Sequence, residues 1–306
     1  MELDLVIRNG VIVDGSGSPR FTADIGIQKG WIVELGCIRS KARQTVDAEG
    51  QVVAPGFIDG HTHMDAQISW DPLGSCSCWH GVTSVVMGNC GFALAPCQPD
   101  QREWIARCLE AVEDIPTESM IAGINWTWET FPEYLDAVGK LPKAINYGAF
   151  LGHSAIRMYI MGDRALHEIG SEEDLQHMGG LVADALNAGA FGFSTSRSST
   201  HVTPDGTPVA SRIADWSEIE YLVDVMARHN RGIFQIAPDV ESGEAHEAFF
   251  ARLKEISVNS ARPTMVGVFS TRQGKDPYPW QSQVKSLDDI AVTGGRVYGQ
   301  TTTKSI

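Results

Sequence analysis

The chain has 306 residues, of which 43% are hydrophobic and 20% are charged, and these proportions are ordinary for a globular protein. Its formal charge is −14, because 24 Lys and Arg residues face 38 Asp and Glu residues, and this balance argues against nucleic acid or an anionic membrane as a partner. The segment from Met1 to Arg8 contains no secretory signal, and no apolar run is long enough to span a bilayer, so we expect a cytoplasmic protein with free thiols.

Residues 1–54 are expected to form a small β module of the sandwich type. Short runs of β-branched and apolar residues are separated by turn signals such as Asn9-Gly10, and several runs alternate apolar with polar residues. This pattern favours antiparallel strands with one packed face. The expected strands are residues 5–7, 10–13, 23–27, 31–35 and 51–53.

Residues 55–306 alternate strand patterns with helix patterns, which predicts parallel strands joined by crossover helices. Polar residues gather at the carboxyl ends of these strands, where barrels build their sites, and no nucleotide-binding glycine loop favours an open sheet. We therefore predict a (β/α)8 TIM-type barrel with about seven of its strands present. One expected strand ends near His61, and the other six occupy residues 82–90, 146–153, 190–196, 232–239, 263–269 and 296–303. The clearest expected helices occupy residues 101–112, 172–187, 216–229 and 243–258.

A short apolar segment that ends in Phe57-Ile58-Asp59-Gly60 leads directly to His61 and His63. If the strand extends through this pair, both side chains project to one face, where two imidazole nitrogens can bind one metal ion. The alternative interpretation is a pair of polar residues at a strand-to-loop corner. The position directly after a buried strand favours metal binding.

Several motifs resemble those of the amidohydrolase superfamily, and within it the N-acyl-D-amino-acid deacylase (D-aminoacylase) family. The resemblance runs from about residue 3 to residue 303, and its motifs lie in residues 54–63, 81–92, 152–162 and 189–195. It implies a metal-dependent hydrolase on a (β/α)8 barrel, with Cys90 of the Gly-Asn-Cys-Gly motif joining His61 and His63 as a ligand of Zn²⁺, one or two ions. Such a metal lowers the pKa of a water molecule and polarises an amide carbonyl.

The chain departs from the family pattern at the fifth and sixth strands, where the family places metal-binding histidines. Residues 234–239 and 268–273 contain no histidine, so His153, His201 and Asp239 are the candidate substitutes. The resemblance also implies an eighth strand that carries a catalytic aspartate, and the chain reads as C-terminally incomplete because no such strand follows the seventh.

Candidates for the remaining roles come from residues near the predicted strand ends. Asp65 and Asp239 are the local stand-ins for the general base, although both also fit a solvated or capping role. His153 is a third catalytic candidate. The carboxylate of an N-acyl amino acid favours an arginine, so the substrate-binding candidates are Arg157 and Arg197, with His201 in a covering loop. Surface arginines and structural histidines are the competing interpretations.

Three functions follow, in order of preference. The first is zinc-dependent deacylation of N-acyl-D-amino acids, which makes a small-molecule N-acylated amino acid the expected partner. The second is an inactive remnant or one subunit of a split amidohydrolase, whose open barrel calls for a homo-oligomer or a complementary C-terminal chain. The third is hydrolysis of cyclic amides of the hydantoin or dihydropyrimidine type, which ranks lower because residues 193–197 lack the lysine that bridges two metals in such sites.

Overall fold

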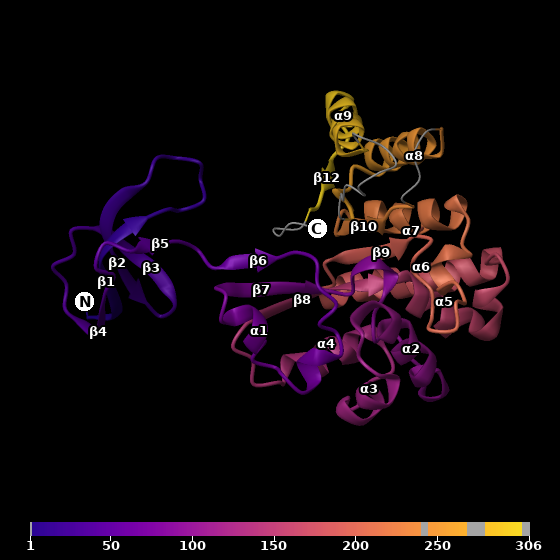
Figure 1. The fold of residues 1–306 in the computed structure, drawn as a ribbon, viewed down its shortest axis with the longest axis horizontal. Helices are drawn as coiled ribbons and strands as arrows, with labels where there is room; N and C mark the ends of the chain where they lie inside the picture. The colour runs from indigo at the N-terminus through magenta and orange to yellow at the C-terminus, as the bar shows by residue number, and fades with distance from the viewer. Residues whose placement is uncertain (1, 240–243, 268–278, 302–306) are drawn as a thin grey trace. The chain divides into compact units, whose positions relative to one another are not determined.

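The computed structural model describes residues 2–239, 244–267 and 279–301 of the chain. The chain divides into two compact units, Met1–Phe57 and Ile58–Ile306, a few residues after the expected boundary at residue 54 (Figure 1). Parts of three expected elements lie outside the described residues. They are residue 243 of the expected helix 243–258, residues 268–269 of the expected strand 263–269 and residues 302–303 of the expected strand 296–303.

The first unit contains a five-stranded mixed sheet with the order β3-β2-β1-β4, and β5 pairs with β1. The pairs β1–β2 and β2–β3 are antiparallel as expected, but β4 and β5 run parallel to β1, so the purely antiparallel prediction is wrong. β4 was not predicted because its sequence, Ala-Arg-Gln-Thr-Val-Asp, is mostly polar and exposed. The strands are β1 (Leu3–Ile12), β2 (Phe21–Gln28), β3 (Trp31–Gly36), β4 (Ala42–Asp47) and β5 (Val52–Val53).

The Asn9-Gly10 pair does not turn the chain. It lies at a register shift inside β1, where Asn9 takes a left-handed conformation with φ 56°. The backbone N–H of Asn9 donates to Asp24, and its side-chain amide donates to Asp47. The two predicted strands on either side of this pair are therefore one bulged strand, since side-chain contacts stabilise the unusual backbone.

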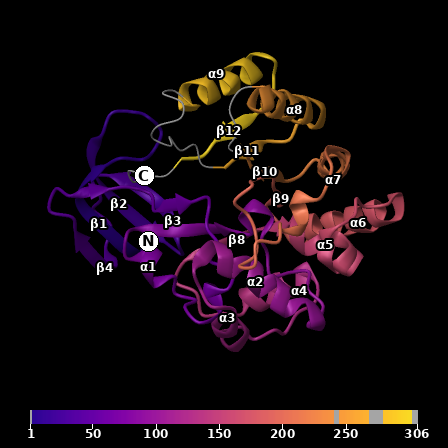
Figure 2. The same cartoon turned by 45° about the vertical axis from the view of Figure 1, so that its right-hand side comes forward.

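The second unit is built on a seven-stranded sheet with the order β12-β11-β10-β9-β8-β7-β6, and the pairs from β7 to β12 are parallel. This is the (β/α)8-type architecture that the sequence predicts, with seven strands among the described residues (Figure 2). The two edge strands approach each other, because Gln300, just after β12, donates to the Gly60 carbonyl after β6. The strands are β6 (Phe57–Asp59), β7 (Val82–Met87), β8 (Asn146–Gly152), β9 (Gly192–Ser196), β10 (Ile233–Ala237), β11 (Thr264–Val266) and β12 (Val297–Gly299).

Four of the helices in this unit confirm the sequence-based expectation: α2 (Arg102–Glu113), α6 (Glu172–Ala188), α7 (Trp216–Arg228) and α8 (Glu244–Ser260). The others were not singled out from the sequence: α1 (Ser75–Cys78), α3 (Thr117–Gly123), α4 (Phe131–Gly139), α5 (His153–Met161) and α9 (Pro279–Val292). Short 3-10 turns complete the unit: η1 (Gln67–Ser69), η2 (Asn89–Gly91), η3 (Pro99–Gln101), η4 (Gly162–Leu166) and η5 (Ala210–Arg212).

Apolar side chains of the strands and helices form one continuous core in the second unit. Phe193 and Phe234, on the neighbouring strands β9 and β10, are fully buried and stack with ring centroids 6.1 Å apart. This packing fixes the strand ends that carry the polar residues. Among the described residues, the helices are too short or too polar to cross a membrane.

Candidate metal centre

His61 and His63 lie just beyond β6 rather than on it, because the strand ends at Asp59. The segment nevertheless runs along β7, since the backbone N–H and the hydroxyl of Thr62 both donate to the Val86 carbonyl at 3.0 and 2.8 Å. Thr62 therefore holds the pair at the carboxyl end of the sheet. The predicted clustering of the two histidines is observed, although strand alternation is not its cause.

Cys90 lies in the tight turn η2, which follows β7. Three residues of the turn region, Gly88, Cys90 and Gly91, adopt positive φ angles of 72°, 58° and 80°. A side chain at Gly88 would bring its Cβ within 2.3 Å of the Phe150 carbonyl oxygen, so the turn requires glycine there. Cys90 itself is a non-glycine residue in the left-handed region, a conformation that persists only where neighbouring groups hold it.

The described residues contain one cluster with metal-ligand geometry, formed by His61, His63 and Cys90. One ligand atom from each residue lies within 4.8 Å of the other two. The Cys90 Sγ atom is 3.2 Å from Nε2 of His61, and the two imidazole rings meet edge to face at a centroid distance of 5.5 Å. Two imidazoles and a thiol are a donor set that suits Zn²⁺.

The electrostatics of the cluster also suit a cation. Burial lowers the pKa of His61, and it lowers that of His63 to about 3, so both rings are neutral with lone pairs available. The buried Nδ1 atom of His63 has no hydrogen-bond partner. Burial raises the pKa of the Cys90 thiol to about 12, against a smaller lowering by the Gln235 side chain, and a bound metal would favour the thiolate. The residues present therefore fit a metal ion.

Gln300 fixes the orientation of His61. Its side-chain oxygen lies 3.0 Å from Nδ1 of His61, so this nitrogen carries the proton and donates, which leaves Nε2 free towards Cys90. Metal-binding histidines commonly use such a partner for the nitrogen that faces away from the metal. Gln300 was not singled out from the sequence, because nothing in its local pattern indicates a contact with a residue on the opposite sheet edge.

Replacing Gln300 with Leu is expected to lower zinc affinity by about 10–100-fold, because the His61 ring loses the acceptor that sets its tautomer. The dissociation constant is measured by competition with a chromophoric chelator. Gln44→Leu, on the exposed strand β4, is the matched control and should leave the affinity unchanged. Equal affinities in the Gln300 variant and the control would contradict this role.

Asp65 does not join the metal ligands. It is fully buried, and its carboxylate accepts a hydrogen bond from the Gly88 N–H at 3.1 Å. Burial raises the pKa of this carboxyl to about 7. The contact with Gly88 supports the turn that carries Cys90, and Asp65 is not part of the metal-ligand cluster, so its position gives no support to the predicted role as general base.

His153 and Arg157, both on α5, are committed to a buried carboxylate. Nε2 of His153 lies 2.7 Å from Glu218, and the Arg157 guanidinium pairs with both oxygens of the same carboxylate. All three side chains are fully buried, and Nδ1 of His153 meets the Thr195 hydroxyl at 2.7 Å. Burial lowers the pKa of His153, which keeps the ring neutral. These contacts leave neither the His153 ring nor the Arg157 fork open to a substrate, so the predicted roles of both residues are not supported.

Arg197 and Asp239 are also engaged elsewhere. The Arg197 guanidinium donates to the Ala214 carbonyl at 2.5 Å and lies over the Trp216 ring at 5.7 Å. Asp239 accepts from the Ser199 N–H at 3.2 Å, so it caps the loop after β9. Neither residue belongs to the group formed by the three metal ligands. Their predicted roles in substrate binding and proton transfer therefore find no support in their positions.

His201 approaches the cluster from the loop after β9. Its ring packs edge to face against Phe92 at 5.1 Å, and Phe92 contacts His63 in the same manner at 5.6 Å. The Ser196 hydroxyl accepts from the Ser198 N–H and lies 2.7 Å from Nδ1 of His201. Burial lowers the pKa of His201 to about 4, so its ring is neutral and lies near the metal-ligand cluster.

The buried histidines make stability depend on pH. Burial lowers the pKa of His63 to about 3 and that of His201 to about 4, whereas both take up a proton near pH 6.5 in the unfolded chain. A lowered pKa gives stability that is present above the unfolded value and is lost on acidification. Each histidine should therefore cost the metal-free chain about 2 kcal/mol in free energy of unfolding between about pH 8 and pH 5.

This dependence is measured by urea unfolding in the presence of a chelator. His201→Gln removes one of the titrating groups and should flatten the profile by about one proton. An unchanged profile in this variant would show that His201 is not protonated on unfolding in this range. Gln44→Leu, on the exposed strand β4, removes no titrating group and is the control that should leave the profile intact.

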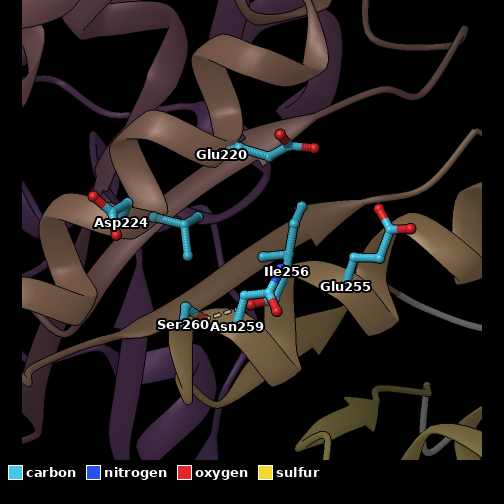
Figure 3. A pocket seen from close by; sticks show the side chains of 7 residues that line it. Glu220, Asp224, Glu255, Ile256, Asn259 and Ser260 are labelled. Atoms are coloured by element: carbon cyan, nitrogen blue, oxygen red, sulfur yellow. Dashed lines mark hydrogen bonds between the residues drawn. The ribbon is translucent and has the colours of Figure 1, made fainter.

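A separate pocket of about 230 Å³ lies between α7 and α8, and shares no residue with the metal-ligand cluster (Figure 3). Its acidic side chains are partly neutralised on the protein surface, because Glu220 pairs with Arg252 and Asp224 pairs with Arg228. None of its residues belongs to the metal-ligand cluster found among the described residues. The cluster of His61, His63 and Cys90 is therefore the candidate functional site. The pocket is lined by Glu220, Val223, Asp224, Glu255, Ile256, Asn259 and Ser260.

A sequence model of the amidohydrolase family matches residues 44–301, so the chain belongs to the amidohydrolase family. Two curated relatives come from Alcaligenes xylosoxydans xylosoxydans. Its N-acyl-D-glutamate deacylase is 32% identical over 290 residues, which cover 94% of this chain and 54% of that protein. Its D-aminoacylase is 36% identical over 193 residues, which cover 63% of this chain and 37% of that protein. The chain thus spans about half the length of the curated relatives it matches.

The fold also matches that of a solved deacylase structure. N-acyl-D-glutamate deacylase from Bordetella bronchiseptica, in complex with zinc and a phosphonate inhibitor, superposes with a TM-score of 0.82 and 27% identity. The match covers 99% of this chain and 59% of that chain. The resemblance to the D-aminoacylase family that the motifs indicate is thereby confirmed.

Proposed function

We propose that this chain carries the metal centre of a zinc-dependent hydrolase of linear amides, with N-acyl-D-amino acids as its substrates. The observation that carries the proposal is the meeting of His61, His63 and Cys90, whose ligand atoms lie within 4.8 Å of one another. The substrate class is supported by the names of the relatives, N-acyl-D-glutamate deacylase and D-aminoacylase. Zn²⁺ bound to such a set supplies a Lewis acid and lowers the pKa of a coordinated water.

The protein groups around the ligands have separate tasks. Gln300 sets the His61 tautomer, and Asp65 supports the turn that carries Cys90. His201, whose ring lies next to the cluster across Phe92, would supply a hydrogen-bonding group to the carbonyl oxygen of the scissile amide, where negative charge grows as the reaction proceeds. The side chain of Phe92 separates His201 from His63 and shields one side of the cluster from water.

A second candidate is one polypeptide of a split amidohydrolase. The metal-ligand cluster in the described residues includes no carboxylate that could accept a proton from a metal-activated water. Asp65 and Asp239 both have other partners. A complementary polypeptide, or a second copy of the chain, would then supply the general base.

The proposal is tested by loading the chelator-stripped chain with zinc and measuring amine release from N-acetyl-D-amino acids, their L enantiomers and hydantoin. We expect zinc-dependent hydrolysis of D substrates and little turnover of hydantoin, because β9 contains no lysine to bridge a second metal. Turnover only of hydantoin would overturn the assignment to linear amides. Bound zinc with turnover only after addition of the C-terminal part of a relative would favour the split enzyme.

A further inference from the structure

The side-chain amide of Gln235 makes a buried contact with the turn η2, which carries Cys90. The proposed function does not explain this contact. Gln235 is the middle residue of β10, and its side chain is fully buried. Its Oε1 atom accepts a hydrogen bond from the Cys90 N–H at 2.6 Å. Its Nε2 atom is buried and has no partner with hydrogen-bonding geometry. One half of the amide is thus strongly engaged, and the other half carries two unused donors.

Gln235 acts together with the neighbouring strand to hold the turn. Ser194, on β9, pairs in register with Gln235 and is also fully buried. The Ser194 hydroxyl accepts from the Gly91 N–H at 3.0 Å and donates to the Gly88 carbonyl. Two side chains from adjacent strands therefore bind consecutive N–H groups of the turn and hold Cys90 at its positive φ. A left-handed cysteine needs such contacts to be retained.

The two ends of the amide present different chemistry to a metal ion. A neutral amide nitrogen has no lone pair to offer a cation, but its N–H groups can donate to a thiolate. Cys90 is held on the side of β10 by the hydrogen bond from its N–H to Oε1 of Gln235. On the other side the Cys90 sulfur faces Nε2 of His61 at 3.2 Å. The contact with Gln235 therefore fixes the backbone of the residue whose sulfur approaches His61.

We propose that Gln235 is a positioning residue that holds the Cys90 backbone through its Oε1 atom and thereby keeps the Cys90 sulfur directed towards the metal site beside His61. This inference rests on the proposed function, because it assumes that His61, His63 and Cys90 bind the metal. It adds a role for a side chain on β10 that is not itself a ligand.

The test uses Co²⁺ as the probe, because the thiolate-to-cobalt charge-transfer absorption reports on the Cys90 sulfur independently of activity. Wild type should bind one Co²⁺ and show this absorption. Gln235→Met keeps the length of the side chain and removes both the acceptor and the donors, so we expect about 10–100-fold weaker binding and a shifted absorption. Thr264→Val, a buried polar substitution on the neighbouring strand β11, is the matched control and should change neither.

A second variant decides the question if Gln235→Met does not fold. Gln235→Glu keeps the shape and the acceptor for the Cys90 N–H but replaces the donors with a carboxylate oxygen, which is a metal ligand. Because the acceptor is kept, this variant should retain the bound Co²⁺ and its thiolate absorption. Wild-type affinity and absorption in Gln235→Met, or loss of the absorption in a folded Gln235→Glu, would overturn the inference alone. No metal bound by wild type would overturn the proposed function with it.

Discussion

Replacing Glu218 with Ala is expected to lower the free energy of unfolding by about 3–5 kcal/mol, because the substitution leaves the Arg157 charge buried without its partner. Burial by itself would raise the pKa of Glu218, but the hydrogen bond from His153 and the charge of Arg157 outweigh it and lower the pKa to about 2. The carboxylate is therefore ionised in the folded chain. Glu218 lies on α7 and connects it to α5, because its carboxylate contacts His153 and Arg157 of α5, the helix that directly follows β8.

The effect is measured by urea unfolding of the metal-free chain near neutral pH. Glu220→Ala, on the same helix, is the matched control, because Glu220 forms an exposed pair with Arg252 that should contribute less than about 1 kcal/mol. A Glu218 variant as stable as the Glu220 variant would show that the buried network does not stabilise the fold.

Replacing Cys90 with Ala is expected to remove zinc-dependent hydrolysis, with a loss of about 10³-fold or more in kcat/KM. The thiol is one of only three ligands in the described cluster, so its removal leaves two imidazoles to hold the ion. Without the ion, the carbonyl of the substrate loses its Lewis acid. The rate is measured with an N-acetyl-D-amino acid at saturating zinc, in the chain alone or with its complementary polypeptide.

Cys97→Ala provides the control for this substitution. Cys97 is a second buried thiol, and burial raises its pKa to about 12, as it does for Cys90. It lies outside the metal-ligand cluster, and its Sγ atom donates to the Gln98 carbonyl. The Cys97 variant should retain zinc and activity apart from a modest loss of stability. Equal activity in the two variants would remove Cys90 from the mechanism.

The fold of the second unit was largely predictable because strands and helices alternate with clear periodicity there. All seven expected strands are present near their predicted positions, and four helices begin and end close to their expected bounds. The short helix α4 was not predicted, although Thr130 and Glu133 form a capping box at its start. The parallel strand β4 could not be predicted, since an exposed polar strand shows no periodic burial.

The candidate site was predictable only in part. The clustering of His61 with His63 was predicted from their spacing on a strand, but the strand ends at Asp59 and the contacts of Thr62 with Val86 hold the pair. The addition of Cys90 came from the resemblance to a family. The contacts of Gln235 and Gln300 join residues more than a hundred positions apart, and local patterns carry no information about such pairs. The burial of Arg157 in an ion pair could not be predicted for the same reason, because its partner Glu218 lies on another helix, distant in sequence.

The central claim is that His61, His63 and Cys90 bind one zinc ion. Elemental analysis of the purified chain tests it most directly, with wild type compared with His61→Ala and Cys90→Ala after dialysis against limiting zinc. The account predicts about one zinc per chain in wild type and a large loss in both variants. Zinc retained in both variants, or none in wild type under conditions where the chain is folded, would contradict it.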